Sequence, residues 1–415
     1  MRRSTDAAPL FSRIRIAILL RWAAVWGPGL LVMLADTDAG QVVTAAQAGA
    51  RWGYRLLPLV LLLIPMLYVV QELTVRLGIA TGRGHGELIR ERFGGGWAWL
   101  SMAGLAAGAI GSLVTEFAGV AGIGELYGLS RTLSLACAAA LLLAVVATGS
   151  YRRVERTALV IGLFELAFFA VAWAAHPQLA SLAGEAADLP LGSPEFRYLA
   201  AAIVGASFNP WMIFYQQSAV ADKGLQIRDL RAARWDTAVG AVLTQLLTAA
   251  VVVAAAATLG FGKTGLASVG EISRAFSPVL GERAGRLIFG AGVLGASLVA
   301  AMVASLALAW GLGEVAGYRR SLEYRPFAAP WFYGAYAGCI IAAAALVWSV
   351  PDLVRLNIAA QVLNAFLLPL VIGFLMALAR TALPESLRPR GWYWGLVLAV
   401  LAAVSGLACY GGIPA

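Results

Sequence analysis

Charge and cysteine are both scarce in this chain. Charged residues make up 13% of its 415 residues, whereas hydrophobic residues make up 60%, and the mean hydropathy is +0.79. This composition excludes an ordinary soluble globular protein and indicates a polytopic membrane protein. The three cysteines stand singly without CxxC spacing, so neither a disulfide framework nor a zinc site is indicated. The chain also has no HExxH motif, which argues against a membrane-embedded enzyme.

Long apolar runs occupy most of the chain. A transmembrane helix needs about 20 apolar residues, and eleven such stretches are separated by arginine-rich or Gly/Pro-containing segments. We therefore expect an all-α integral membrane protein with a single transmembrane domain over 27–411. Residues 1–26 lack the features of a cleaved signal peptide and are expected to form a cytoplasmic tail. The expected spans are 27–49, 55–79, 97–126, 131–149, 157–175, 198–220, 237–260, 285–315, 329–350, 355–379 and 391–411.

The chain has a net charge of +9, and the distribution of its basic residues indicates how it is oriented in a membrane. Arginine and lysine concentrate in the N-terminal tail and in alternate loops, such as 152–156, 222–236 and 319–325, as the positive-inside rule describes. This asymmetry predicts a multi-pass protein of the plasma (inner) membrane with a cytoplasmic N-terminus and an extracytoplasmic C-terminus. The segment 222–236 is expected to form a short interfacial helix. Nucleic acid is not expected as a partner, and no obligatory protein partner is evident beside the lipid bilayer.

The first apolar run is interrupted by polar residues. Asp36, Asp38, Gly40 and Gln41 lie within it, and a carboxylate in hydrocarbon costs roughly 2.5 kcal/mol or more unless it meets a partner, an ion or water. Gly40 adds a place where the helix can open, so we expect a break near 38–41. A broken helix with an acidic residue at the break is a common cation site in secondary transporters.

A second interruption follows about 170 residues later. Gly205–Ser218 again combines small and polar residues with a proline, and Pro210 prevents a regular helix there. Two broken helices at corresponding places point to a binding site between them. Five spans before this one and five from it onward suit a LeuT-type five-plus-five inverted repeat, with broken helices 1 and 6 and one additional helix at the end.

Several segments resemble the NRAMP family of divalent-metal transporters. The segment after Asp38 resembles the family's Asp-Pro-Gly-Asn motif in helix 1, and the resemblance continues in order along nearly the whole chain. The segments that carry it are Asp38–Gln41, Thr44, Gly49–Tyr54, Leu77–Arg83, Glu87–Arg92 and Glu116–Gly119. The resemblance implies alternating-access transport of a divalent metal ion.

The departures from the family pattern favour a particular branch. Where NRAMP metal transporters have Met-Pro-His in helix 6, this chain has Asn209-Pro210-Trp211, and Leu113 stands where the family has an acidic residue. Gln216 or Gln217 replaces a later histidine. These changes resemble the NRAMP-related magnesium transporters, which lack proton coupling. An amide oxygen in place of a thioether also removes the soft ligand that favours manganese or iron.

The expected metal ligands come from both breaks and from helix 10. Asp38 and Gln41 offer hard oxygens at the first break, and Asn209 with the carbonyl of Ala206 does so at the second. Gln361 matches a glutamine that the family places near the ion. Secondary candidates are Asp36, Ser207, Gln216, Gln217, Asn364 and Glu116. No cofactor is expected, since Mg²⁺ or Mn²⁺ is the transported substrate.

These residues predict an importer of Mg²⁺, and also of Mn²⁺, that is not coupled to protons. The only histidines, His85 and His176, lie outside the spans, so no histidine relay is available. Glu165 and Glu314 could carry protons instead, although pairing with a basic residue is the simpler explanation of both. Two rivals remain: a proton-coupled Mn²⁺/Fe²⁺ symporter of the ordinary NRAMP type, and a transporter of the same fold for a small organic solute.

Overall fold

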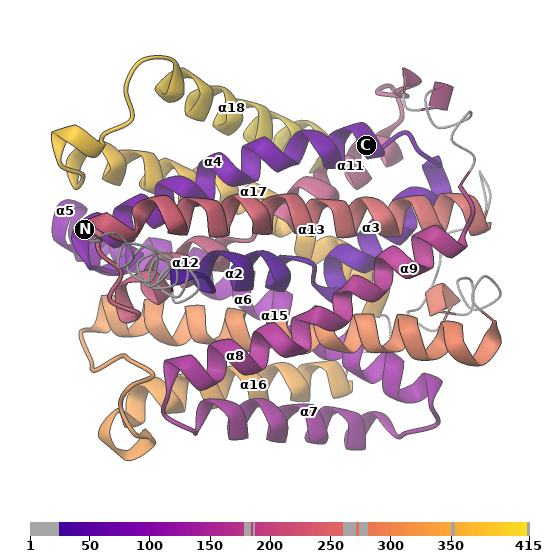
Figure 1. The fold of residues 1–415 in the computed structure, drawn as a ribbon, viewed down its shortest axis with the longest axis horizontal. Coiled ribbons are helices and arrows are strands. Elements are labelled where there is room, and N and C mark those ends of the chain that lie inside the picture. The colour runs from indigo at the N-terminus through magenta and orange to yellow at the C-terminus, as the bar shows by residue number, and fades with distance from the viewer. Residues whose placement is uncertain are drawn as a thin grey trace, which may run out of the picture.

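The computed structural model describes residues 25–177, 184–185, 187–259, 271–273, 281–349 and 353–412. Regular structure in these residues is helical throughout, which confirms the all-α expectation. Long helices run side by side in one bundle (Figure 1). Most of the predicted tail, 1–24, lies outside the described residues.

The helices follow the predicted spans closely. They are α2 Pro28–Asp36, α3 Ala39–Trp52, α4 Leu57–Thr81, α5 His85–Phe93, α6 Gly95–Leu126, α7 Arg131–Val146, α8 Tyr151–Gly162, α9 Ala167–Ala174, α11 Pro194–Ser207, α12 Pro210–Asp222, α13 Leu230–Leu259, α15 Glu282–Ala316, α16 Pro330–Ser349, α17 Leu353–Thr381 and α18 Trp392–Gly412. A 3₁₀ segment, η1 Leu163–Leu166, joins α8 to α9. Within the described part of the chain, eight helical segments are long and apolar enough to cross a membrane; α2–α3, α7 and α18 supply the other three expected spans.

Two details of the first broken helix and its neighbours differ from the sequence expectation. The break lies at Thr37 and Asp38, so the prediction that it extends to Gly40 is wrong. Asp38 has extended backbone angles and its carboxylate accepts a hydrogen bond from the Gln41 amide, so Gly40 already belongs to the first turn of α3. His85, expected in a loop, begins the short helix α5.

The basic segment 222–236 does not form a separate interfacial helix. Only a 3₁₀ turn, η2 Ile227–Asp229, precedes Leu230, where α13 starts and then continues for 30 residues. Asp236 accounts for the difference. Its carboxylate accepts hydrogen bonds from the backbone amides of Gly27, Gly29 and Leu30 at 3.2, 2.7 and 3.2 Å, which fixes the first turns of α13 against the start of α2.

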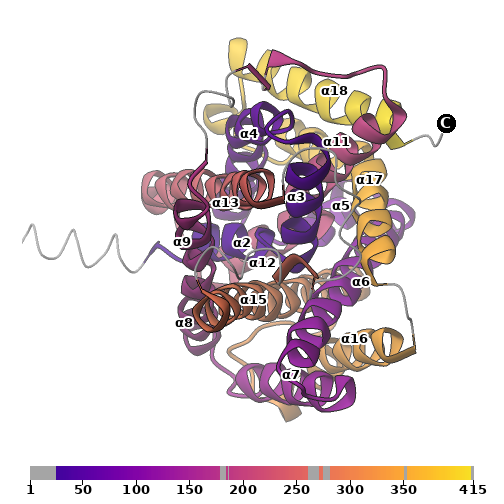
Figure 2. The same cartoon turned by 90° about the vertical axis from the view of Figure 1, so that its right-hand side faces the viewer.

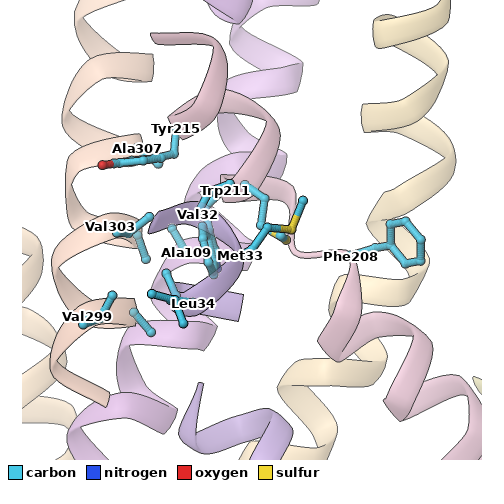
Figure 3. Packing of buried hydrophobic residues seen from close by; sticks show 14 of the residues in the cluster. Val32, Met33, Leu34, Ala109, Phe208, Trp211, Tyr215, Val299, Val303 and Ala307 are labelled. Atoms are coloured by element: carbon cyan, nitrogen blue, oxygen red, sulfur yellow. The ribbon is translucent and has the colours of Figure 1, made fainter. Parts of the chain in front are cut away.

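The broken helices lie at the centre of the bundle. α13 packs along α2, α3 and α4, while α15 packs along α6 and also contacts α2 and α12 (Figure 2). The packing is close where side chains are small: a Cβ atom on Gly240 would lie 2.7 Å from Met33, and one on Gly29 would lie 2.8 Å from Asp236. Val32, Trp211 and Val303 pack beside the breaks (Figure 3). The site is therefore enclosed by a closely packed apolar wall.

Candidate ion-binding site

The first break is held open by two carboxylates. Asp38 is the N-cap of α3, and its Oδ1 accepts the Gln41 amide at 2.6 Å. Glu116, from α6, accepts the next amide, that of Ala39, at 3.0 Å. The first amides of a helix have no intrahelical acceptor, and the positive end of the helix dipole favours negative charge. Asp38 and Glu116 therefore approach each other at one helix terminus.

The second break is organised by Asn209. Pro210 starts α12, and Phe208 and Asn209 are the two non-helical residues that precede it. The Asn209 Nδ2 donates to the Ala206 carbonyl at 2.9 Å. Its Oδ1 accepts from Asn364 Nδ2 at 2.5 Å and lies 3.3 Å from the Ser112 hydroxyl. Asn209 thus connects the break to α17 and α6.

Helix 10 contributes a pair of amides to this arrangement. Gln361 and Asn364 are three residues apart on α17, and Asn364 Nδ2 also lies 3.2 Å from Gln361 Oε1. Gly205 allows α11 to approach α17 closely, since a Cβ atom at this position would collide with the Gln361 carbonyl. The backbone of α11 therefore lies directly on α17, and both amides are placed beside Asn209.

Several buried oxygens at the breaks have no hydrogen-bond partner within the described residues. They are Asp36 Oδ1 and Oδ2, Asp38 Oδ2, Gln41 Oε1, Ser207 Oγ and Asn364 Oδ1. Asp36 and Asp38 are fully buried, and Gln41 is 2% exposed. Buried polar atoms are normally paired, and a buried unpaired carboxylate is especially costly. This concentration of unpaired hard oxygens is what a bound cation would satisfy.

The structure brings most of the expected residues together but separates two of them, Gln216 and Gln217. Asp36 ends α2 and Asp38 caps α3, so the two aspartates lie on either side of Thr37 at the first break. Gln41 donates from its amide nitrogen to the Thr248 hydroxyl of α13 at 2.6 Å, which leaves its Oε1 without a partner among the described residues. Gln216 donates to Thr237, and Gln217 donates to the Arg83 carbonyl, so neither side chain reaches the breaks.

Ser207 was expected at the second break, but the hydroxyl groups of Ser112, Thr37, Thr244 and Thr248 were not expected from the sequence. Ser112 accepts the Trp211 indole N–H at 3.0 Å while contacting Asn209. Thr37 and Thr244 share a hydrogen bond of 2.7 Å. Thr244 and Thr248 lie four residues apart on α13, and so on one face of that helix. That spacing was the only available sequence signal, and it is equally common in helices where threonine bonds to its own backbone.

Met33 of α2 packs its Cβ and Cγ against Gly240 of α13. No group of three or more His, Cys, Asp and Glu side chains in the described ranges is placed to hold a metal ion. A cation at the breaks would therefore depend on two aspartates together with amide, hydroxyl and carbonyl oxygens.

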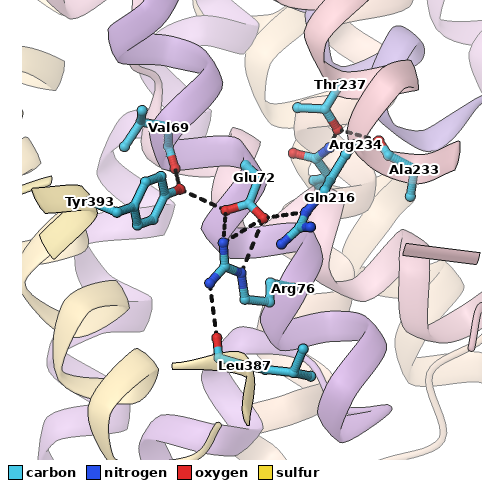
Figure 4. Close-up of polar contacts among 9 residues, drawn as sticks. All are labelled: Val69, Glu72, Arg76, Gln216, Ala233, Arg234, Thr237, Leu387 and Tyr393. Carbon is cyan, nitrogen blue, oxygen red and sulfur yellow. Dashed lines mark hydrogen bonds and ion pairs between the residues drawn. The ribbon is translucent and has the colours of Figure 1, made fainter. Parts of the chain in front are cut away.

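A second set of buried carboxylates lies at the end of the bundle that carries α5. Glu72 of α4 accepts from Arg76 at 2.7 Å, from Arg234 at 2.7 Å and from the Tyr393 hydroxyl at 2.6 Å (Figure 4). Glu314 of α15 accepts from Ser218 at 2.5 Å and from the Gly86 amide at 2.8 Å, and lies 3.9 Å from Arg320. The expected pairing of Glu314 with a basic residue is thus observed.

Comparison with known proteins places the chain in a family. The profile described as "Natural resistance-associated macrophage protein-like" (Nramp) matches residues 29–413. The divalent metal cation transporter MntH of Klebsiella pneumoniae strain ATCC 700721 / MGH 78578 is 28% identical over 409 residues, which cover 94% of each chain. The MntH of Klebsiella pneumoniae strain 342 is 30% identical over 297 residues, covering 68% of this chain and 70% of that one.

Solved structures agree on the fold. The crystal structure of the Eremococcus coleocola manganese transporter aligns with a TM-score of 0.76 at 16% identity, covering 94% of this chain and 86% of that chain. The nucleobase-cation-symport-1 transporter Mhp1 aligns with a TM-score of 0.57 at 16% identity, covering 94% and 90%. The LeuT-type arrangement with broken helices 1 and 6 is thereby confirmed. The chain belongs to the Nramp family, and is a multi-pass membrane transporter of divalent metal ions rather than an enzyme.

Proposed function

We propose that this transporter imports Mg²⁺, and also Mn²⁺, by alternating access and without coupling to protons. The observation that carries the proposal is the set of unpaired buried oxygens at the two breaks, with an amide rather than a thioether at position 209. Carboxylate, amide and carbonyl oxygens suit hard cations, whereas sulfur would favour softer metals. Asp36 and Asp38 would supply a charge of −2 for a divalent ion.

The amides suit an ion that keeps part of its hydration shell. Mg²⁺ gives up its waters reluctantly and is usually held by one or two carboxylates plus water. Asn209, Asn364 and Gln361 present donors and acceptors in one connected group, so they can bind water molecules as well as the ion itself. Direct coordination would come from Asp38, with Asp36 beside it.

The driving force we propose is the ion's own electrochemical gradient. With a cytoplasmic N-terminus, an interior-negative potential contributes about 2.3 kcal/mol per elementary charge per 100 mV toward uptake. Two features of the described residues support this mechanism. Leu113, buried in α6, cannot carry a proton. Burial lowers the pKa of His85 to about 4, so its imidazole stays neutral at physiological pH.

One observation favours a second candidate, the proton-coupled Mn²⁺/Fe²⁺ symporter. Glu116 and Asp38 interact directly as two buried carboxyl groups. Like charges at such short range can share a proton, which metal binding would displace. The manganese substrate named for the structural relative also points in this direction.

Uptake into proteoliposomes separates the two candidates. The purified chain would be reconstituted into vesicles that contain a magnesium-sensitive dye, with a pH-sensitive dye in a parallel batch, and an inside-negative potential would be imposed. Mg²⁺ uptake without acidification is the expected result. Mn²⁺ uptake with acidification, together with no Mg²⁺ uptake, would contradict the proposal and favour the symporter. Vesicles with the Asp38→Asn variant provide the control for leak.

A further inference from the structure

Trp211 places a hydrogen-bond donor inside the apolar core next to the second break. It directly follows Pro210 on the first turn of α12, where NRAMP metal transporters have a histidine, and its side chain is fully buried. The ring belongs to the apolar cluster beside the breaks (Figure 3). A buried indole N–H normally has an acceptor, which an aliphatic side chain or phenylalanine would not need. The position of that acceptor shows what Trp211 can do.

The acceptor is the hydroxyl group of Ser112 on α6. Trp211 Nε1 lies 3.0 Å from Ser112 Oγ, and an indole N–H can only donate. One lone pair of the hydroxyl oxygen is thereby occupied, and the hydroxyl donates in turn to Asn209 Oδ1 at 3.3 Å. This second distance is long for an O–H···O bond, so it is the weaker of the two contacts. The hydrogen bonds thus run from Trp211 through Ser112 to Asn209.

The orientation of the Asn209 carboxamide is defined by its other neighbours. Its nitrogen must face the Ala206 carbonyl, at 2.9 Å, because a carbonyl oxygen can only accept. The Asn209 oxygen therefore faces α6 and α17, where it accepts from Ser112 and, at 2.5 Å, from Asn364. An inverted carboxamide would place its oxygen against the Ala206 carbonyl and leave two acceptors in contact. The chemistry of the neighbours therefore admits one orientation of Asn209.

Ser112 lies on the face of α6 that meets both breaks. Glu116, one turn further along α6, accepts the first amide of α3, that of Ala39, at 3.0 Å. Residues four apart on a helix are neighbours, with Cβ atoms about 5–6 Å apart. The contact of Ser112 with the second break and that of Glu116 with the first break are therefore adjacent. The chain of hydrogen bonds from Trp211 thus ends within the proposed ion site.

We propose that Trp211, acting through Ser112, is a positioning residue that holds the Asn209 carboxamide in the orientation in which the site binds the divalent ion. Trp211 itself does not contact the ion. Without the indole proton, the Ser112 hydroxyl is free to turn to a carbonyl of its own helix, as serine commonly does, and Asn209 loses a donor. A group that is already oriented before the ion arrives costs less free energy to order on binding. The inference deepens the proposed function and rests on its claim that a divalent ion binds at the breaks.

A double-mutant cycle on divalent-ion affinity tests this chain of hydrogen bonds. Binding of Mg²⁺ and, separately, of Mn²⁺ would be measured by calorimetry in detergent for the wild type, Trp211→Phe, Ser112→Ala and the double variant. Trp211→Phe keeps an aromatic ring and removes the N–H donor. Each single change should weaken binding roughly 3- to 10-fold, as expected for one hydrogen bond. The double variant should bind no more weakly than the weaker single variant, because both changes interrupt the same chain.

A second cycle and a matched control separate positioning from packing. Trp211→Phe should have no further effect on affinity in an Asn209→Leu background, because the carboxamide that Trp211 orients is then absent. Trp310→Phe makes the same change at a similarly buried tryptophan of α15. The Trp310 indole nitrogen has no hydrogen-bond partner in the part of the chain that the structure describes, so this variant should keep the wild-type affinity.

Three results would overturn the proposal. They are an unchanged affinity in Trp211→Phe, additive losses in the Trp211→Phe and Ser112→Ala double variant, and an equal loss in Trp310→Phe. Failure of the proposed function would give a different result. A wild type that binds Mn²⁺ but not Mg²⁺ would contradict transport of Mg²⁺, whereas the cycle measured with Mn²⁺ would still decide whether Trp211 positions Asn209.

Discussion

The buried carboxylates at the breaks and those at the α5 end of the bundle share the same burial but differ in their partners. Asp36, Asp38 and Glu72 are all at most 2% exposed. Glu72 accepts hydrogen bonds from two arginines and a tyrosine, whereas neither oxygen of Asp36 accepts one within the described residues. The difference shows that burial alone does not identify a functional acid. A buried carboxylate that lacks hydrogen-bond donors is the one that remains available to an ion.

Asp236 and Glu155 extend the same contrast. Asp236 accepts hydrogen bonds from three backbone amides at the start of α2. Glu155 forms an ion pair with Lys223 at 2.8 Å. Lys223 also donates to the Trp26 carbonyl at 2.9 Å. These contacts hold the start of α2 against α13, α8 and α12. Carboxylates at this end therefore fasten helices together, and those at the breaks remain available to an ion.

The largest expected effect comes from removing the charge at the break. Asp38→Asn retains a good N-cap for α3, so the variant should fold with a Tm close to that of the wild type. Loss of the charged ligand should cost about 2–5 kcal/mol, which is roughly 30-fold to several thousand-fold in divalent-ion affinity, and should abolish uptake. Proteoliposome uptake and calorimetry provide the measurements. Normal uptake by Asp38→Asn would mean that the unpaired aspartate is not a ligand.

Glu72→Gln tests the paired carboxylates at the α5 end of the bundle. Arg76 and Arg234 would keep their charge without a carboxylate, and breaking a buried ion pair costs about 3 kcal/mol or more. Arg234 is partly exposed, so the lower end of that range is expected. Thermal unfolding should show the loss, while Mg²⁺ affinity of the folded protein is retained. Glu125→Gln, which breaks an exposed pair with Arg131, should cost less than about 1 kcal/mol.

His85 is expected to make the stability of the folded protein depend on pH. Its Nδ1 lies 3.0 Å from Gln217 Oε1 and its ring packs against Phe214, and burial lowers its pKa from 6.5 to about 4. The unfolded chain therefore binds a proton at higher pH than the folded chain, so stability falls as pH drops from 6.5 toward 4. The difference amounts to about 3 kcal/mol.

Comparison of the wild type with His85→Asn isolates this contribution from those of other titrating groups. Tm would be measured in detergent at pH values from 7.5 to about 4. The wild type should lose stability more steeply than the variant over that interval. Parallel curves would show that His85 takes up a proton in the folded chain as readily as in the unfolded chain, which would also reopen a histidine route for protons.

The smallest expected effect is a change of selectivity at the second break. Asn209→Met restores a thioether, and it should shift the Mn²⁺ or Cd²⁺ to Mg²⁺ affinity ratio on the order of tenfold toward the softer ions. Competition binding measures the ratio. Asn209→Leu removes the amide without adding sulfur, so it controls for the lost contacts to Asn364 and Ala206. Equal ratios in the two variants would exclude a role for the ligand atom.

Local sequence features predicted the two breaks better than they predicted the surroundings. Pro210 and the carboxylates near Asp38 interrupt apolar runs, and each acts within a turn of its own position. Gly40 was misassigned because its backbone freedom is visible in the sequence, whereas the capping of α3 by Asp38 and Glu116 depends on helix α6. The roles of Gln216 and Gln217 were equally undetermined. Both lie on a buried helix, and only their neighbours decide where they point.

The sequence by itself determined the class of the protein, the number of its spans and the location of its interruptions, because hydrophobic length and proline geometry act locally. Only the tertiary structure decided which buried carboxylates are paired. Glu72, Glu165 and Glu314 look alike in sequence, but their partners come from other helices: Arg234 and Tyr393 for Glu72, Ser218 for Glu314, and no donor among the described residues for Glu165. A hydrogen bond requires a donor within about 3 Å, and contacts between distant segments at that range are set by helix packing.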